Sequence, residues 1–425
     1  MKQIFILLLL LLTGVLSTFS QPSDTIIIIK ADRLFDGETL HINYSVAIKG
    51  NVIVAVGNEK DFHLNGTIKR IDLNGCTILP GLIEGHSHLF LHPYNEVKWD
   101  EQVLNESVAE RTARAVTHAQ KTLMAGFTTV RDLGTEGAGY ADVGLKEAIE
   151  KGVVPGPRMI VATRAIVATG SYGPKLKNEM HTIIRGAAEA DGIDALIKEA
   201  RTQIGNGADV VKVYADYRWG LNKKSAPTFT DEELKTVVAV AASSGRKVVA
   251  HAGTEEGMRR CILAGISTIE HGDMGSAEVF ELMVKNKVAL CPTISAGIAV
   301  SEYAGWKKGQ PDPERIANKK KSFALALQKG VTICFGGDVG VYPHGDNARE
   351  MEAMVEYGMK PLDVLKSATS VNADVFGYGD SIGRLKPGLL ADVIAIQGDP
   401  VSNISNVRKT KLIIKNGKLY KLQQE

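Results

Sequence analysis

The sequence is poor in several features that would mark a specialised class of protein. It holds only four cysteines in 425 residues, and none of them form a CxxC pair, which argues against a disulfide scaffold. Lys plus Arg number 50 and Asp plus Glu number 48, so the charges nearly balance. Such a balance does not suggest nucleic acid or an anionic membrane surface as a partner. The hydrophobic share of 44% excludes a disordered chain. We therefore expect a globular protein with a sizeable core.

The longest apolar run stands near the start of the chain. Lys2 precedes an unbroken apolar stretch from Ile4 to Leu12, and small residues follow it. This layout is typical of a secretory signal peptide, whereas a membrane span needs about 18 or more apolar residues. We expect residues 1–20 to be removed before Gln21, leaving an exported, periplasmic or secreted protein with no membrane attachment.

The rest of the chain begins and ends with short β-like runs and alternates strands with helices between them. Eight apolar runs predict the strands of this middle part: "TILPGLIEGHSHLFL", "FTTVRDLG", "RMIVATRAI", "DVVKVYAD", "KVVAHAG", "STIEHGD", "ALCPTIS" and "TICFGGDVG".

Amphipathic segments separate several of these runs and predict helices at 107–125, 193–204, 231–244 and 313–329, with glycine near their C-terminal ends. Eight β-then-α units predict an α/β protein with a parallel TIM-like (β/α)8 barrel, whose ligands gather at the carboxyl ends of the strands. A doubly wound open sheet is the alternative, but no GxGxxG follows a first strand.

The run "DVVKVYAD" has an unusual inner face. Val211 and Val213 share one side, and Lys212 and Tyr214 share the other, because alternate side chains of a strand point to opposite sides. If the apolar side meets the helices, Lys212 points inward, where lysine is rare unless it has a partner. The alternative is a lysine that reaches solvent at the open end of the barrel.

Four histidines and an aspartate stand near the ends of other predicted strands. His86 and His88 share a face of the first strand, His251 and His271 end two later ones, and Asp338 ends the last. Since carboxyl ends of parallel strands meet at one edge, we expect these five side chains to converge. Imidazole with carboxylate is a good ligand set for a divalent transition metal.

Two bound metal ions would need a bridging anion. The amine of Lys212 can supply one by taking up carbon dioxide as a carbamate, and desolvation favours the neutral amine that this reaction needs.

These residues and their flanking motifs resemble the metal-dependent amidohydrolase superfamily, and within it the exported dipeptidase and prolidase-like group related to imidazolonepropionase. The resemblance covers about Thr25 to Tyr420 and is carried by these stretches: "LPGLIEGHSHL", "AGFTTVRDLG", "GADVVKVYAD", "GRKVVAHAGTEEGMRRCILAGISTIEHG", "FGGDVGVYPHGDNARE" and "SIGRLKPGLLADVIAIQGDP". It implies a hydrolase barrel at 76–384 and a small β-sandwich domain composed of 21–75 and 385–425.

The resemblance also implies the roles of the site residues. His86, His88 and Asp338 would hold one metal ion, His251 and His271 the other, and carboxylated Lys212 would bridge the two, which are usually zinc in this family. A metal-bridging hydroxide would attack the amide carbonyl, with Asp338 as general base and then general acid. The implied substrate is a small-molecule amide, namely a dipeptide or an N-acyl amino acid.

Two positions depart from the family pattern. Dipeptidase relatives often carry Gly-Gly-His-Gly after the third strand, where this chain has "ATGSYGPK" with Tyr172, and Glu84 stands where Asp commonly precedes the HxH pair. We expect Tyr172, Tyr214 and His344 to contact substrate. Alternatively, Tyr172 anchors its loop, Tyr214 fills the interior of the barrel, and His344 is a solvated loop residue.

The sequence is also compatible with other functions. A mononuclear deaminase or cyclic-amide hydrolase would have no need of Lys212 and typically carries Glu three residues after the fifth-strand His, where Thr254 stands and Glu255 comes one later. A catalytically silent binding protein would be expected to have lost some ligands. A lactone or phosphoester substrate is compatible with the same chemistry, and a homo-oligomer is compatible with the sequence.

Overall fold

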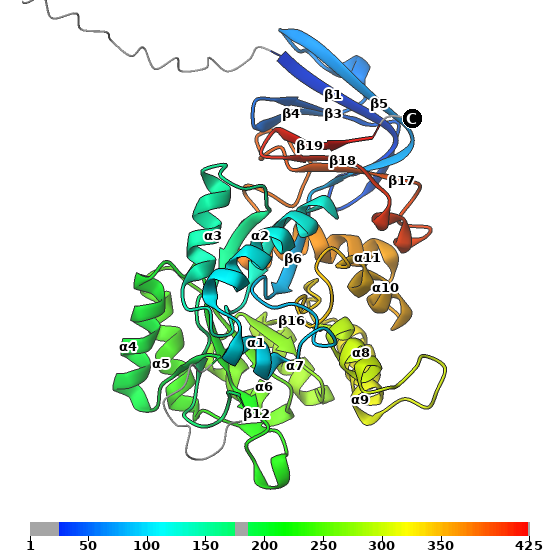
Figure 1. The fold of residues 1–425 in the computed structure, drawn as a ribbon. Helices are drawn as coiled ribbons and strands as arrows, with labels where there is room; N and C mark the ends of the chain where they lie inside the picture. Colours follow the sequence, from blue (N-terminus) through cyan, green and yellow to red (C-terminus); the bar gives the residue numbers. More distant parts are fainter. Residues whose placement is uncertain (1–24, 175–185, 424–425) are drawn as a thin grey trace, which may run out of the picture.

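The computed structural model describes residues 25–174 and 186–423, and Figure 1 shows their arrangement. The expected leader, residues 1–20, lies outside the described residues. No helix among the described residues is long and apolar enough to cross a membrane.

One sheet of eight strands combines the two ends of the described chain (blue and red in Figure 1). Its strands are β1 (Thr25–Phe35), β2 (Leu40–Ile42), β3 (Ser45–Lys49), β4 (Val52–Gly57), β5 (Thr67–Pro80), β17 (Val393–Gln397), β18 (Thr410–Lys415) and β19 (Lys418–Leu422). β5 connects the early and late strands, because it pairs parallel to β1 and antiparallel to β17. Isoleucine, valine and leucine side chains of these strands form a buried cluster of their own.

The middle of the chain builds parallel sheets and the helices around them. A three-stranded sheet contains β6 (Leu82–Ser87), β7 (Phe127–Asp132) and β8 (Arg158–Val161). A six-stranded sheet contains β9 (Ile166–Val167), β10 (Ala188–Glu189), β11 (Val211–Tyr214), β14 (Val248–Ala252), β15 (Thr268–His271) and β16 (Ala289–Cys291). A hairpin of β12 (Asp216–Tyr217) and β13 (Ala226–Pro227) follows β11.

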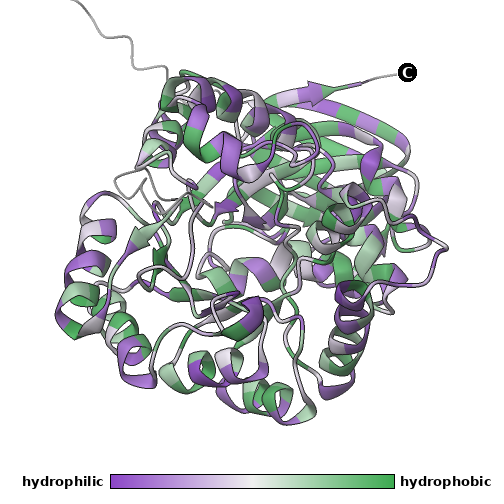
Figure 2. Cartoon of the chain, turned by 60° about the horizontal axis from the view of Figure 1, so that its bottom comes forward, coloured by the Kyte–Doolittle hydropathy of each residue, from purple (hydrophilic) through white to green (hydrophobic). Residues whose placement is uncertain are grey.

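The helices surround these strands in Figure 2, each carrying hydrophilic as well as hydrophobic residues. They are α1 (Trp99–Asn105), α2 (Val108–Met124), α3 (Ala141–Glu150), α4 (Gly192–Gly205), α5 (Asp231–Ala242), α6 (Glu255–Ala264), α7 (Ala277–Asn286), α8 (Ile294–Tyr303), α9 (Glu314–Lys329), α10 (Ala348–Glu356), α11 (Pro361–Lys366) and α12 (Asn372–Phe376). Short helical turns lie at η1 (Glu59–Asp61), η2 (Leu221–Lys223), η3 (Ser367–Val371) and η4 (Ile404–Arg408).

The α/β class and the four helices predicted from sequence are confirmed, as α2, α4, α5 and α9. Capping residues explain two of the helix starts. The Ser107 hydroxyl accepts a hydrogen bond from the amide of Glu110 at the start of α2, and Thr230 with Glu233 forms a reciprocal capping box at α5. At the end of α9, Gly330 takes φ 74°, a left-handed conformation that costs glycine little.

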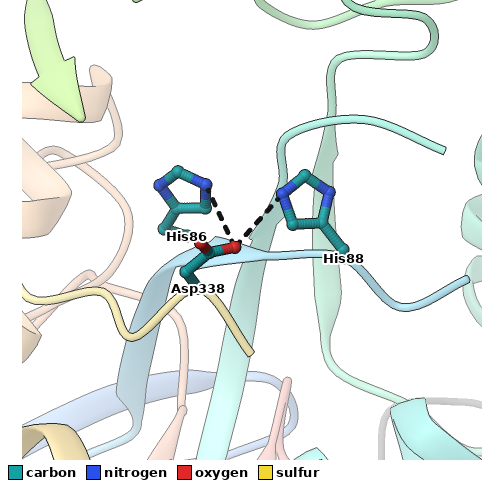
Figure 3. Close-up of side chains that lie close together, drawn as sticks. All are labelled: His86, His88 and Asp338. Carbon is teal, nitrogen blue, oxygen red and sulfur yellow. Dashed lines mark ion pairs between the residues drawn. The ribbon is translucent and has the colours of Figure 1, made fainter. Parts of the chain in front are cut away.

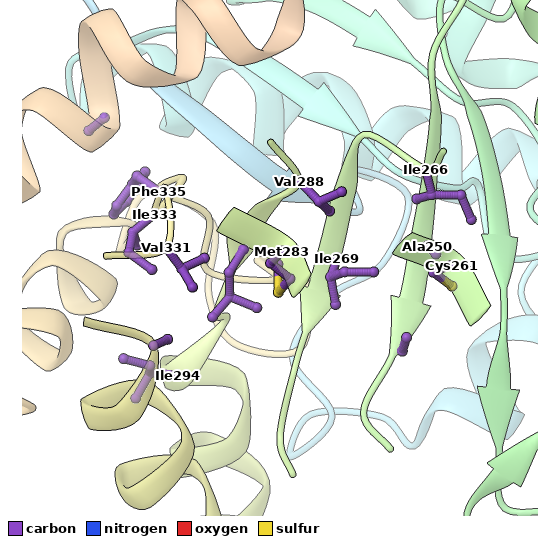
Figure 4. Packing of buried hydrophobic residues seen from close by; sticks show 14 of the residues in the cluster. Ala250, Cys261, Ile266, Ile269, Met283, Val288, Ile294, Val331, Ile333 and Phe335 are labelled. Carbon is purple, nitrogen blue, oxygen red and sulfur yellow. The ribbon is translucent and has the colours of Figure 1, made fainter. Parts of the chain in front are cut away.

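The predicted alternation of β11 is confirmed. Val211, Val213 and Ala215 belong to the main apolar cluster, which joins strands and helices, whereas Lys212 and Tyr214 do not. Figure 4 shows part of this cluster, including Ala250 and Ile269 from neighbouring strands and Met283 from α7. The inward face of β11 is therefore free to carry polar side chains.

Hydrogen bonds join the two parallel sheets on both sides. On one side, the amide of Asp209 donates to the carbonyl of Val161 at the end of β8 (2.8 Å). On the other side, the segment predicted as the eighth strand lies between β16 and β6. Ile333 forms a β-bridge with Leu290 in β16, and Val339 forms one with Ser87 in β6. These are single bridges, and the segment forms no regular strand. The amide of Cys334 donates to Leu290 in β16 (2.8 Å).

Glycine explains why this last segment is irregular. A Cβ on Gly336 would lie 2.5 Å from Cys291 Sγ and 2.7 Å from the amide nitrogen of His86. The backbone therefore approaches β6 and β16 more closely than a side chain allows. Cys291 and Cys334 pack as small apolar residues in a buried cluster with Ala289.

We expect Gly336→Ala to lower the free energy of unfolding by about 1–3 kcal/mol, because a methyl group there must displace packed atoms of β6 and β16. Chemical denaturation measures the change. Gly205→Ala is the matched control, since nothing lies within 4 Å of the added Cβ, and it should stabilise the chain by about 0.5 kcal/mol. Equal stability of the Gly336→Ala variant and wild type would contradict the close approach.

Candidate metal centre and substrate cavity

The residues predicted to hold metal meet at the carboxyl ends of the parallel strands. Figure 3 shows the first group, in which one oxygen of Asp338 lies between two imidazoles. Asp338 Oδ1 is 3.6 Å from His86 Nε2 and 3.3 Å from His88 Nε2. Ligand atoms of all three lie within 4.8 Å of one another, close enough to share one metal ion.

His251 and His271 lie directly beside this group. The ring centroids of His86 and His271 are 5.2 Å apart, and those of His271 and His251 are 4.3 Å apart. A second pair of imidazoles thus adjoins the first group of ligands, as the sequence predicts.

Hydrogen bonds fix the Nδ1 atoms of three rings. His86 Nδ1 is 2.8 Å from Glu270 Oε2, His88 Nδ1 is 2.8 Å from the carbonyl of Gly134, and His271 Nδ1 is 2.7 Å from Thr293 Oγ1. Such partners hold an imidazole in one orientation and one tautomer, which leaves Nε2 free for a metal ion.

Left-handed backbone conformations aim two of these side chains. His271 has φ 78° and Asp338 has φ 61°, values that cost a non-glycine residue free energy. In β15, His271 follows Glu270, so strict alternation would send the two side chains to opposite faces. The left-handed conformation of His271 allows its side chain to line the cavity while Glu270 contacts His86.

Lys212 is buried between these groups. Lys212 is only 1% exposed, and its Nζ has no hydrogen-bond partner among the described residues. Burial lowers the pKa of the ammonium, although Glu270 and Asp338 oppose that effect. The alternative of a lysine reaching solvent is therefore wrong.

The imidazoles differ in charge because of their surroundings. Burial, followed by the charge of Lys212, lowers the pKa of His86 to about 4 and that of His251 to about 3. Burial also opposes the charged ring of His88, but the hydrogen bond and charge of Asp338 outweigh it and raise the pKa to about 9. Neutral imidazole is the form that binds metal, so a cation bound here would displace the proton of His88.

Glu84 links the first strand to the last segment. Its Oε1 accepts hydrogen bonds from the amides of His86 (3.1 Å) and Gly337 (2.9 Å), and its Oε2 accepts one from Asn347 Nδ2 (2.9 Å). Burial raises the pKa of this carboxyl to about 8. Glu84 thus helps to set the position of the backbone on either side of the site.

Glu270 is a site residue that sequence reasoning did not single out. Besides His86, it contacts Arg131, whose Nη2 lies 2.9 Å from Glu270 Oε1, and it accepts from Thr268 Oγ1 at 2.5 Å. Burial opposes the charge of Glu270, but Arg131, His86 and Lys212 together outweigh it and hold the pKa of the carboxyl far below its usual range. Arg131 thus has a structural role, with Glu270 as its partner.

A cavity of about 290 Å³ opens over these residues. Its lining includes the predicted substrate contacts Tyr172 and Tyr214, together with Tyr94, Tyr217, Glu136, Arg218 and Arg315. Glu136 was also missed. It lies in a loop with φ 49°, where no periodic pattern indicates which way a side chain points.

His344 lies apart from this lining. Its ring stacks on His118 at a centroid distance of 4.2 Å, and its Nε2 is 2.9 Å from the carbonyl of Leu91. The residue is 5% exposed, so it is neither a cavity contact nor a solvated loop residue. Its position gives no support to the predicted substrate contact.

A model of the amidohydrolase family matches residues 77–420, well over half of the chain. The chain belongs to the amidohydrolase family. Among curated relatives, this amidohydrolase is 30% identical to ochratoxinase from Aspergillus niger over 91% of its own length and 84% of the relative's. It is also 21% identical to imidazolonepropionase from Fusobacterium nucleatum, over 92% and 94% of the two chains.

Solved structures agree with this assignment. A crystal structure titled as an Xaa-Pro dipeptidase with bound methionine in the active site superposes with a TM-score of 0.81, at 31% identity, over 93% of this chain and 100% of that one. Such neighbours imply a TIM-like barrel. The amidohydrolase is therefore a hydrolase acting on carbon–nitrogen bonds, and the reading as a silent binding protein is set aside.

We expect Glu270→Gln to lower the free energy of unfolding by about 3 kcal/mol, because the guanidinium of Arg131 would remain buried without its counter-charge. Glu281→Gln is the control, since Glu281 pairs with Lys329 at the surface and its loss should cost less than about 0.5 kcal/mol. Denaturant titration of both variants gives the comparison. A loss in the Glu270 variant no larger than in the control would show that the buried pair is not a structural requirement.

Proposed function

We propose that this chain is an exported, binuclear metal-dependent amidohydrolase that cleaves the amide bond of a dipeptide or an N-acyl amino acid. The observation that carries the binuclear assignment is Lys212, a buried amine with no hydrogen-bond partner among the described residues. A lone buried ammonium is costly, whereas a carbamate on the same nitrogen would be an anionic oxygen ligand with a use at this position.

The donor set around Lys212 fits two divalent cations, with zinc as the expected metal. His86, His88 and Asp338 would hold one, His251 and His271 the other, and the carbamate of Lys212 would bridge them. Every one of these imidazoles and the carboxylate lies next to another member of the set. When bound, such cations lower the pKa of a water molecule and polarise a carbonyl group.

Asp338 is the residue proposed to move protons. Burial opposes its charge, but His86 and His88 outweigh that effect and bring the pKa of the carboxyl to about 2, so it is a carboxylate at neutral pH. In the proposed reaction Asp338 accepts a proton from the attacking water and delivers it to the leaving nitrogen. An amine is a poor leaving group unless it is protonated, so both transfers are needed.

The cavity lining supports a substrate with a free carboxylate. Arg218 and Arg315 line the cavity, both are exposed, and neither forms an ion pair within the described residues. Lys319, in contrast, is already bound, because its Nζ lies 2.5 Å from Asp273 Oδ1. Dipeptides and N-acyl amino acids both carry the carboxylate that these arginines could bind.

The position of Glu255 favours this proposal over a mononuclear deaminase. Its Oε1 accepts a hydrogen bond from Ser276 Oγ (2.8 Å), and it does not line the cavity. The neighbouring Thr254 caps α6 and donates to Asp216. Neither residue offers a proton shuttle to the site.

We also propose how the chain is organised around this chemistry. The hydrogen bonds at Val161 and Leu290 support closure of the parallel strands and the irregular eighth segment into a barrel at 76–384. The segments 21–75 and 385–425 would form the accompanying β domain. Export by a leader at 1–20 remains part of the proposal.

We expect the wild-type chain, reconstituted with zinc, to release free amino acid from members of a library of dipeptides and N-acyl amino acids. Lys212→Met should lower kcat/KM on the best substrate by about 100-fold or more, because no anionic bridge can form. Lys212→Glu is the matched variant, since it supplies a carboxylate at that position and should retain more activity.

Amino acid release measured by chromatography decides the outcome. No release from any library member would contradict the proposed substrate class. Equal activity of Lys212→Met and wild type would contradict the proposed bridging role.

A further inference from the structure

The chemistry proposed above leaves one buried charge in the cavity without a role. Glu136 is 2% exposed and lines the cavity, yet no cationic side chain pairs with its carboxylate among the described residues. The nearby Arg111 is occupied elsewhere, because its Nη1 and Nη2 donate to the backbone carbonyls of Glu136 (2.8 Å) and Thr135 (2.9 Å). Buried charges in proteins are usually paired.

Three neutral donors hold the carboxylate in place. Trp99 Nε1 and the hydroxyl of Tyr172 donate to Oε2, and the hydroxyl of Tyr214 donates to Oε1. The Trp99 and Tyr214 bonds are each 3.0 Å long. Because these donors are neutral, they orient the carboxylate while leaving its negative charge in the cavity.

The tyrosine and tryptophan donors belong to a cluster of aromatic rings. The ring of Tyr172 lies 5.1 Å from Trp99, 4.5 Å from Tyr214 and 4.9 Å from Tyr217, measured between centroids. The faces of such rings attract cations, most strongly where water is excluded. Tyr172, which stands where relatives often have histidine, is thus the ring common to all three contacts.

The carboxylate also lies close to the reacting centre. A Cβ added to Gly134 would be 3.5 Å from Glu136 Oε1 and 3.7 Å from His88 Cε1, so both atoms border one small volume. Tyr214, which donates to the same carboxylate, stacks on the ring of His251 at a centroid distance of 4.8 Å. A group bound at Glu136 would therefore sit next to the amide to be cleaved.

We propose that Glu136, with the rings of Tyr172, Tyr214 and Tyr217, forms a subsite for a protonated amine on the acyl side of the substrate. The inference rests on the proposed amide hydrolysis and narrows its substrates to those with an amine there. That amine is either the α-ammonium of a dipeptide or the side-chain ammonium of its first residue.

Three substrates that share a phenylalanine leaving group separate these sources. Leucyl-phenylalanine carries an α-amine, isocaproyl-phenylalanine is its des-amino analogue, and ε-aminocaproyl-phenylalanine carries the amine at the end of the chain. Wild type should prefer one of the two amine-bearing compounds over the neutral one by about tenfold or more in kcat/KM. Whichever compound is preferred identifies the source.

The substitution Glu136→Gln tests the residue itself, since it keeps the shape and one acceptor oxygen while removing the charge. It should lower the kcat/KM ratio of the preferred amine-bearing compound to isocaproyl-phenylalanine from about tenfold or more to about one. Glu255→Gln, outside the cavity, is the matched control and should keep the preference. A Glu136→Gln variant that keeps the preference, or that loses all three activities equally, would overturn the proposal.

A binding measurement separates this proposal from the hydrolytic one. Calorimetry with leucinamide, a cation, and isocaproamide, its neutral analogue, should give tighter binding of the cation to wild type but not to Glu136→Gln. If that Glu136-dependent difference is found while no amide is turned over, the subsite stands and the proposed hydrolysis fails. Equal binding of the two amides to wild type would contradict the subsite whether or not turnover occurs.

Discussion

The buried ion pair between Arg131 and Glu270 is the interaction on which the rest of the site depends. It joins β7 to β15 across the interior, and the second oxygen of Glu270 fixes the Nδ1 atom of His86. Arg131 also donates to the carbonyl of Gly85, in β6 (2.6 Å). Three strands are therefore positioned by two side chains. Each of the two charged groups makes three hydrogen bonds, which a buried pair needs in order to be stable.

Above this pair, the chain concentrates groups that would each be unfavourable alone. The amine of Lys212 is buried without a hydrogen-bond partner, and His271 and Asp338 adopt left-handed backbone conformations. The close approach at Gly336 brings the last segment against His86, and Glu84 ties the two backbones together. The buried amine and the two left-handed conformations cost stability, and with the close backbone approach they bring the proposed ligands into contact, as expected when strain is retained for function.

The direction of a side chain could be predicted from the sequence where a strand imposes its period of two. That period placed Lys212 on an inner face, and strand ends brought the histidines and Asp338 together. It could not identify Glu270 as the partner of Arg131, because cross-strand partners depend on register and not on local pattern. Glu136 and His344 lie in loops, where side-chain direction follows from φ and from long-range hydrogen bonds. The eighth predicted strand is irregular because Gly336 admits a close backbone approach that a β pattern does not reveal.

The central claim is that Lys212 makes this a two-metal site. The most direct test is the number of zinc ions bound per chain, measured by elemental analysis of the active, dialysed protein and compared with Lys212→Met. We expect about two ions per wild-type chain and fewer in the variant. One ion per fully active wild-type chain, unchanged in Lys212→Met, would contradict it.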